Sequence, residues 1–293
     1  YNMSNFKLFC FGFGQVAKYF VKNLIEKNYK FDLITTNTTD TQIKKISNLN
    51  YKTYFFKDDK FDNHLLKDLN SSNKVLVSIP PKNETDIVLN LFDKSFRTNK
   101  FDWVTYLSAT SVYGDKKGNW VNEQTIPEPT SKRGIIRLNV ERQWLKYYND
   151  FNLPLQIFRL SGIYSLENNI IKRLKMGTLK IIEKNNHYFS RIHVEDIAVA
   201  LTLSLKKFST GQVFNISDNY PCSNEEIAKY AANLMKMSLP QKIKPEDIES
   251  KMLKSFYKDS KKVCNKKMKQ FFFYELKYPT FKEGLNMIRN NMI

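Results

Sequence analysis

The 293-residue sequence has only three cysteines and three histidines. Cys10, Cys222 and Cys264 lie far apart, and no two of them have the C-x-x-C spacing. This scarcity argues against structural disulfide bonds and against thiolate metal sites. The histidines are equally dispersed, so we expect no metal centre in this protein.

Long apolar runs are also lacking, and no segment has the unbroken length of a membrane span. The first residues do not show the basic and then apolar pattern of a secretory signal, so we expect a cytoplasmic protein without a membrane partner. A hydrophobic content of 42% indicates a globular chain, long enough for one large core or two coupled domains.

Acidic side chains are scarce relative to basic ones, 29 against 47, which gives a formal net charge of +18. Such an excess fits a nucleic-acid partner, an anionic substrate or simply a lysine-rich surface. The basic residues are densest between Lys251 and Lys269 and are otherwise spread along the chain. Because no recognised nucleic-acid-binding module accompanies the charge, we do not expect a nucleic-acid partner.

Only nine glycines occur, yet two of them stand close together in the segment Gly12–Ala17, which reads G-F-G-Q-V-A. The apolar run Phe6–Phe11 before it predicts a buried strand, and Val16, Phe20 and Leu24 after it have the spacing of one helix face. A strand, a glycine turn and a helix are the context in which G-x-G-x-x-A predicts dinucleotide binding.

Each position of this motif has a physical reason. Gly12 permits the tight turn, Gly14 lets the backbone approach a pyrophosphate, and the N-terminus of the helix attracts the anion. We therefore predict that Gly12, Gly14, Gln15 and Val16 bind NAD or NADP. The alternative is a glycine turn that binds no ligand.

Apolar strands alternate with helix-period segments over the first two thirds of the chain, with short connections. This alternation predicts an α/β fold, a Rossmann-type doubly wound parallel sheet with a smaller C-terminal α/β substrate lobe. Right-handed crossovers bring the loops after several strands to one ligand-binding edge. The further predicted strands are Phe31–Thr36, Tyr51–Phe56, Lys74–Ile79, Trp103–Leu107, Leu155–Arg159 and Val213–Ile216.

The end of the second predicted strand bears on the choice between NAD and NADP. An acid at this place binds the ribose 2′-hydroxyl in NAD-dependent folds. Here Thr36 and Asn37 are neutral, so no carboxylate repels a 2′-phosphate, and we predict that these two residues bind the cofactor. This tilts the choice weakly toward NADP. Ser78 and Pro80, after the fourth predicted strand, are predicted to bind the cofactor at the same edge.

Six segments in this order along the chain carry a family resemblance: Gly12–Ala17, Leu107–Gly114, Phe158–Tyr164, Arg191–Ala198, Val213–Ser217 and Tyr278–Leu285. Together they resemble the extended short-chain dehydrogenase/reductase superfamily, in its NAD-dependent epimerase/dehydratase group. They are most similar to an atypical branch whose members begin with G-x-G-x-x-A. We predict an NAD(P)-binding Rossmann domain of residues 1–165, to which 190–217 return, and a smaller substrate-binding lobe of 166–189 and 218–293.

The resemblance implies a catalytic Ser/Thr followed by Tyr-x-x-x-Lys, and this chain departs from all three positions. Alignment of the neighbouring motifs places Ala109, Arg133 and Arg137 there. A guanidinium keeps its proton at any working pH, so Arg133 cannot act as the general acid. Arg137 still offers donors that could bind a ribose. This branch therefore lacks the usual proton donor.

The remaining site residues follow from the same motifs. We name Arg137, Tyr113 and Ser108 as catalytic candidates, and a packed aromatic at a loop is the alternative for Tyr113. The substrate-binding candidates are Ser111, Tyr164 and Arg191, where Tyr164 has the same packed alternative.

The segment around His193 also bears on the substrate. The resemblance places a phosphate-contacting arginine of sugar-nucleotide epimerases at the position of Phe189, which disfavours a nucleotide sugar. Arg191 is a better candidate for an anionic group, with a surface salt bridge as the alternative. His193 and Asp196 are expected to fix a loop onto a helix rather than to perform chemistry.

Three functions remain open from the sequence. The first is an NAD(P)-dependent oxidoreductase or epimerase acting by hydride exchange on a small, anionic carbonyl or hydroxyl compound. The second is a non-catalytic NAD(P)-binding redox sensor, supported by the three lost catalytic matches. The third and least supported is RNA binding, and a homodimer is left open.

Overall fold

The computed structural model describes residues 5–292, which form two compact units. The first unit comprises residues 5–108, 136–158 and 197–214. The second comprises residues 109–135, 159–196 and 215–292. Compact packing does not show what each unit binds, so the cofactor and substrate domains predicted from the sequence stay predictions. Over residues 5–292, no helix combines the length and apolar character that crossing a membrane requires.

A nine-stranded sheet organises the first unit, in the order β13-β9-β7-β6-β1-β2-β4-β3, with β5 beside β4. β1 pairs in parallel with β2 and β6, as do β2 with β4 and β6 with β7, which confirms the predicted Rossmann-type sheet. β3 and β5 pair antiparallel with β4 and were not predicted. The strands are β1 Phe6–Phe11, β2 Phe31–Asn37, β3 Gln42–Ile46, β4 Leu49–Lys57, β5 Lys60–Phe61, β6 Lys74–Val77, β7 Trp103–Ala109, β9 Leu155–Leu160 and β13 Gln212–Ile216.

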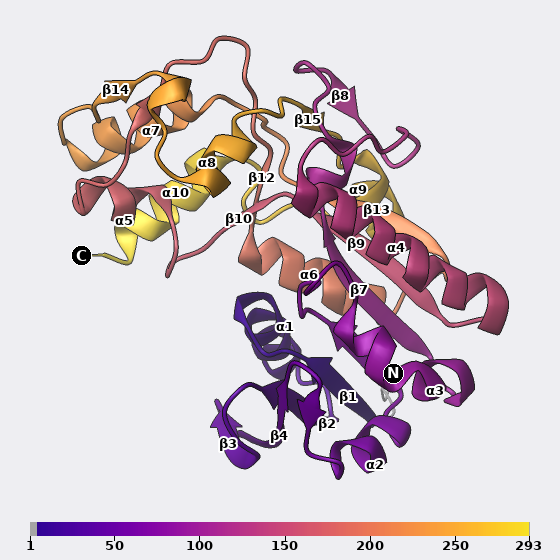
Figure 1. Ribbon diagram of the computed structural model, residues 1–293. Helices are drawn as coiled ribbons and strands as arrows, with labels where there is room; N and C mark the ends of the chain where they lie inside the picture. Colours follow the sequence, from indigo (N-terminus) through magenta and orange to yellow (C-terminus); the bar gives the residue numbers. More distant parts are fainter. Residues whose placement is uncertain (1–4, 293) are drawn as a thin grey trace. The chain divides into compact units, whose positions relative to one another are not determined.

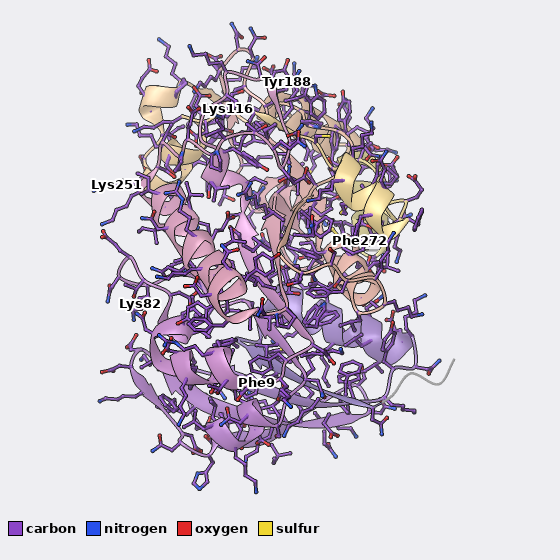
Figure 2. The ribbon with its side chains drawn as sticks, turned by 90° about the vertical axis from the view of Figure 1, so that its right-hand side faces the viewer. Phe9, Lys82, Lys116, Tyr188, Lys251 and Phe272 are labelled. Atoms are coloured by element: carbon purple, nitrogen blue, oxygen red, sulfur yellow. The ribbon has the colours of Figure 1, made fainter. Side chains whose placement is uncertain are left out.

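Helices cover both faces of this sheet because its strands are apolar on both sides. Phe9 and Phe11 pack in one cluster with residues of α2, α3 and α4. On the other face Trp103 stacks on Phe20 of α1 and donates its indole N–H to Ser204 of α6. Figure 2 shows Phe9 among the packed side chains of this unit. The helices are α1 Gln15–Glu26, α2 Leu65–Asn70, α3 Ile87–Thr98, α4 Lys132–Phe151 and α6 Val194–Ser204.

The second unit is built from short elements around a helical core. Its parallel strand pairs are β10–β12, β11–β14 and β15–β8. Helix α7 contacts both α5 and α10, and the three helices appear together in Figure 1. The elements are η1 Thr110–Tyr113, β8 Trp120–Val121, β10 Gly162–Tyr164, α5 Ile170–Lys175, β11 Ile181–Ile182, β12 Arg191–His193, α7 Asn224–Met235, β14 Lys242–Ile243, η2 Pro245–Asp247, α8 Lys251–Phe256, β15 Lys262–Val263, α9 Lys266–Phe272 and α10 Phe281–Asn290.

Local capping signals explain where two of these helices begin. Ser223 caps α7 by accepting a hydrogen bond from the backbone N–H of Glu226. The Glu226 carboxylate accepts from the Tyr220 hydroxyl. α10 begins with a complete capping box between Thr280 and Glu283, which the sequence analysis did not identify.

Gly284 of α10 allows Tyr164 to pack against the helix backbone. A Cβ at this position would lie 2.5 Å from Cε2 and 2.6 Å from Cζ of the Tyr164 ring. We expect Gly284→Ala to lower the free energy of unfolding by about 1–3 kcal/mol, because overpacking exceeds the gain of about 1 kcal/mol in helix propensity. Urea unfolding of the wild type, of Gly284→Ala, of Tyr164→Ala and of the double variant measures this. If Gly284→Ala lowers the free energy of unfolding by the same amount in the Tyr164→Ala background as in the wild type, the steric explanation is wrong.

Candidate functional site

The predicted glycine turn lies between β1 and α1, as expected. Gly12 has a φ of +82°, a conformation that side chains with a Cβ rarely adopt. A Cβ there would also lie 2.9 Å from Ser78 Oγ and 3.1 Å from Ile79 Cγ1. The fold itself therefore requires glycine at position 12.

Gly14 differs because nothing in the protein requires glycine there. Its φ is −83°, which other residues adopt freely, and a Cβ would meet no atom within 4 Å. Gly14 is also the N-cap of α1, which has no side-chain cap and no acidic residue in its first turn. The backbone at this helix end is thus open to an anion, and the residues present fit the pyrophosphate of a dinucleotide.

Thr36 and Asn37 shape the neighbouring turn at the end of β2. The backbone N–H of Gly12 donates to Thr36 Oγ1 at 2.8 Å. Asn37 donates from Nδ2 to Thr53 Oγ1, and its Oδ1 accepts from the backbone N–H groups of Thr39 and Asp40. Both side chains are therefore engaged in the turn, and their part in binding a ribose stays a prediction.

The other predicted cofactor residues, Ser78 and Pro80, follow the end of β6. Ser78 donates from Oγ to the backbone oxygen of Phe11 at 3.0 Å, which links the ends of β6 and β1. Pro80, two residues on, is exposed. The two strand ends thus lie side by side, as the parallel pairing predicted.

Arg137 is oriented by the end of β7. Its Nη1 donates to the Tyr106 hydroxyl at 2.9 Å and to the backbone oxygen of Leu107 at 3.2 Å. Ser108, the next residue on this strand, donates its hydroxyl proton to Glu141 Oε1 at 2.5 Å, and both side chains are buried. This geometry favours a structural part for the Ser108 hydroxyl, while the half-buried Arg137 keeps further N–H donors.

Tyr113 is fully buried in the second unit. Its hydroxyl donates to Asn215 Oδ1 at 2.7 Å, and the Arg159 guanidinium lies 5.0 Å from its ring centroid. Burial raises its pKa, the opposite of what a proton donor near neutral pH needs. The geometry thus favours the packed aromatic over the catalytic candidate.

Ser111 and Arg133 lie in the same unit. A Cβ at Gly134 would come within 2.6 Å of the Ser111 backbone oxygen, so glycine brings the start of α4 close to η1. The Arg133 guanidinium lies over the Phe256 ring at 5.8 Å. Neither position supplies a group that could replace the missing tyrosine, whereas a substrate contact from Ser111 stays a prediction.

Arg191 and Tyr164 lie on the paired strands β12 and β10. The Arg191 Nη1 donates to the backbone oxygens of Phe189 and Cys222 at 3.3 and 3.4 Å. The Tyr164 hydroxyl is buried without a hydrogen-bond partner, and burial raises its pKa. Its ring meets His193 edge-on at 5.0 Å.

His193 and Asp196 fasten a loop, which is the geometry expected of a structural pair. His193 Nδ1 accepts from the backbone N–H of Glu195 at 3.1 Å, and burial lowers its pKa to about 4. Asp196 is fully buried and accepts from the backbone N–H groups of Lys277 and Tyr278 and from the Tyr274 hydroxyl.

Asp218, which the sequence analysis did not single out, is an acid of the second unit whose side chain is buried. Its carboxyl group is buried, one oxygen accepts from the Tyr220 backbone N–H at 2.9 Å, and Oδ2 has no partner. Burial raises its pKa to about 7, although the charge of Arg191 opposes this. No local pattern in the sequence indicates that this aspartate is buried.

This shift predicts a pH-dependent stability. The folded state binds the Asp218 proton up to about pH 7, whereas an unfolded aspartate loses it near about pH 3.9. Stability from this group is thus fully present below pH 4 and is lost as the pH rises toward 7. We expect Asp218→Asn to flatten the fall in urea midpoint between pH 5 and 7.5, with the exposed Asp247→Asn as control. Equal slopes in all three proteins would contradict this.

Within residues 5–292, no group of three or more His, Cys, Asp and Glu side chains is arranged to hold a metal ion. The described cysteines are all free thiols. The polar groups described on β1, β2, β6 and β7 belong to the first unit, and those on β10 and β12 belong to the second.

The fold and the glycine turn agree with a known protein family. The model of the NAD dependent epimerase/dehydratase family matches residues 12–217. The chain belongs to this family. The resemblance of the sequence motifs to the NAD-dependent epimerase/dehydratase group is thereby confirmed, whereas its placement in an atypical branch stays a prediction.

Individual relatives of this epimerase/dehydratase-family chain are distant. It is 27% identical to the dTDP-D-glucose 4,6-dehydratase of Dictyostelium discoideum over 162 residues, 48% of this chain and 36% of that protein. A functionally unknown conserved protein from Silicibacter pomeroyi DSS is 31% identical, with a TM-score of 0.85 and coverage of 98% and 99%. UDP-glucuronic acid 4-epimerase from Bacillus cereus, solved with NAD, shares the fold at 18% identity, a TM-score of 0.77 and coverage of 97% and 99%.

Proposed function

We propose that this protein is an NAD(P)-dependent oxidoreductase or epimerase-type enzyme acting on a small, anionic carbonyl or hydroxyl compound. The nicotinamide of the bound cofactor supplies hydride exchange. The observation that carries the proposal is the open backbone at Gly14, where α1 begins without a cap and a Cβ would touch no protein atom. Among family members, such an opening accommodates the pyrophosphate.

Different residues of the first unit would bind different parts of the cofactor. Gly12 makes the turn, while Gly14, Gln15 and Val16 line the start of α1. Arg137, held by Tyr106 and the Leu107 oxygen, would donate its remaining N–H groups to a ribose.

The end of β2 supports a cofactor preference only weakly. Thr36 and Asn37 bring no charge, but Asp40 lies in the same turn, and its Oδ1 accepts from Thr39 Oγ1 and Gln42 Nε2. We propose NADP as the preferred cofactor because Thr36 and Asn37 at the end of the strand carry no charge. Since a carboxylate near the ribose favours NAD, and Asp40 lies in this turn, the titration must also include NAD.

A second candidate is a non-catalytic NAD(P)-binding protein that reports redox state. Ala109 and Arg133 at the usual Ser and Tyr positions favour it. So do the buried hydroxyls of Ser108 and Tyr113, each already donated to a neighbouring side chain. Either candidate requires dinucleotide binding, and only the first requires turnover.

Calorimetric titration with NAD⁺, NADH, NADP⁺ and NADPH tests both candidates, and NAD(P)H oxidation by small keto acids, aldehydes and ketones separates them. We expect binding of at least one dinucleotide together with oxidation by an anionic carbonyl compound. Binding with no turnover across the panel would favour the redox sensor. No heat with any of the four dinucleotides would refute both.

A further inference from the structure

The guanidinium of Arg137 is held by two uncharged oxygen atoms. Its Nη1 donates to the Tyr106 hydroxyl at 2.9 Å and to the Leu107 backbone oxygen at 3.2 Å. Burial raises the pKa of Tyr106, so this hydroxyl stays neutral near pH 7. The two oxygens therefore fix the direction of the guanidinium without cancelling its positive charge.

Two further buried side chains hold the Tyr106 ring in place. The Trp144 ring stacks on it, with centroids 5.7 Å apart and an interplanar angle of 24°. The Trp144 indole N–H donates to Asp86 Oδ2 at 3.1 Å, and Asp86 Oδ1 accepts from the backbone N–H of Leu89 in the first turn of α3. Tyr106, Trp144 and Asp86 are at most 2% exposed. Because such a core is close-packed, the Tyr106 hydroxyl cannot turn away from Arg137.

Tyr106 connects β7 to two positions of α4. Arg137 and Trp144 lie seven residues apart on this helix, which places them two turns apart on one face. Tyr106 contacts both of them from β7. Because both hydrogen bonds of Arg137 use Nη1, its Nε and Nη2 donors form none with residues 5–292. These donors remain available to a ligand beside the carboxyl end of β7.

The order of the strands indicates which ribose of a dinucleotide Arg137 would meet. β1 lies between β2 and β6, and β7 follows β6. In doubly wound sheets the pyrophosphate lies at the turn after the first strand, and the adenosine ribose lies at the end of the second strand. The end of β7 is on the opposite side of that turn from β2. Arg137 would therefore meet the ribose of the nicotinamide half.

We propose that Tyr106 is a positioning residue that orients Arg137 toward the ribose of the nicotinamide half. The inference rests on the proposed function, which supplies the cofactor, and adds to it a residue that touches no ligand. An unanchored arginine loses rotamer entropy when a ligand orders it, whereas an anchored one has lost that entropy on folding. The Tyr106 hydroxyl thus raises the affinity for the cofactor through Arg137 alone.

Tyr106→Phe tests this role because it removes the hydroxyl and keeps the ring. In calorimetric titration we expect NAD⁺, NADP⁺ and ADP-ribose to bind about three- to tenfold more weakly, and ADP, which lacks the second ribose, to change less than about twofold. Tyr54→Phe is the matched control, since Tyr54 is a buried tyrosine of the same unit whose hydroxyl donates to Asp68. It should change each affinity less than about twofold.

A double-mutant cycle shows whether Tyr106 acts through Arg137. In the Arg137→Gln background, Tyr106→Phe should weaken binding by less than a further factor of about two. A full additional loss in this background would overturn the inference. So would wild-type affinity of Tyr106→Phe for NAD⁺, NADP⁺ and ADP-ribose, or an equal loss for ADP and ADP-ribose.

A measurement without ligand keeps this inference apart from the proposed function. We expect ¹⁵N relaxation of the ligand-free protein to show that the order parameter of the Arg137 Nε–H bond falls from about 0.85 to below about 0.6 in Tyr106→Phe. This fall in a protein that binds no dinucleotide would refute the proposed function, while the anchoring of Arg137 by Tyr106 would stand. Unchanged order in a protein that binds dinucleotides would refute the positioning role alone.

Discussion

Replacing Gly14 by valine is expected to weaken NAD and NADP binding by about 100-fold or more, a loss of about 2.7 kcal/mol. The side chain would occupy the open space in front of α1, where a Cβ meets no protein atom within 4 Å. There it would keep the pyrophosphate from the backbone N–H groups of the first turn, which supply most of the attraction for the anion. The free protein should tolerate the change, because the φ of −83° suits valine.

The stability of the variant decides how the result is interpreted. Valine is a poorer N-cap than glycine, so a cost of up to about 1 kcal/mol in unfolding free energy is expected. His64→Val is a matched control, since His64 is the N-cap of α2 and likewise accepts no capping hydrogen bond. Calorimetric titration should show binding by the control within about twofold of the wild type. If Gly14→Val binds either dinucleotide as tightly as the wild type, the proposed cofactor site is wrong.

The same glycine turn shows what local sequence could predict. Phe6–Phe11, Gly12 and the apolar spacing of α1 are read within twenty residues, and the structure confirms the strand, turn and helix. The strand Gln42–Ile46 was missed because it is polar and mostly exposed, with neither the alternation nor the apolar run that marks a strand. It forms because its backbone pairs with β4 across a tight turn.

The site depends on contacts that no local pattern encodes. Ser108 was a catalytic candidate on its motif alone, but its partner Glu141 lies 33 residues further along the chain. The sequence likewise could not show that Gly12 donates to Thr36, or that Asp218 is buried with an unpartnered oxygen. Position along a strand could be predicted, whereas the hydrogen bonds that engage a side chain arise from tertiary packing.

Asp196→Asn is expected to have the largest effect on stability, about 3 kcal/mol in the free energy of unfolding. The carboxylate accepts from Lys277 N–H at 2.7 Å and from Tyr278 N–H at 3.0 Å, through different oxygens. An amide has only one accepting oxygen, so one buried backbone N–H would face an NH₂ group and lose its partner. The side chain is fully buried, so water cannot replace the lost bond.

Glu195→Gln provides the matched control for this experiment. Glu195 is the neighbouring acid in the first turn of α6, half-buried, and its Oε1 accepts from Lys277 Nζ across 3.5 Å at an exposed position. Weak, solvated pairs of this kind contribute at most about 1 kcal/mol. Urea unfolding gives the global effect, and hydrogen exchange at the amides of Lys277 and Tyr278 shows whether the loop has come loose.

The exchange measurement also distinguishes a structural role of the pair His193–Asp196 from a catalytic role. If Asp196 fastens the loop, its substitution accelerates exchange at both amides about 30-fold or more, for a local loss of about 2 kcal/mol, in protein without any ligand. Dinucleotide affinity should stay within about twofold, because none of the contacts of Asp196 involves the glycine turn. Unchanged exchange together with lost turnover would instead assign this aspartate to the reaction.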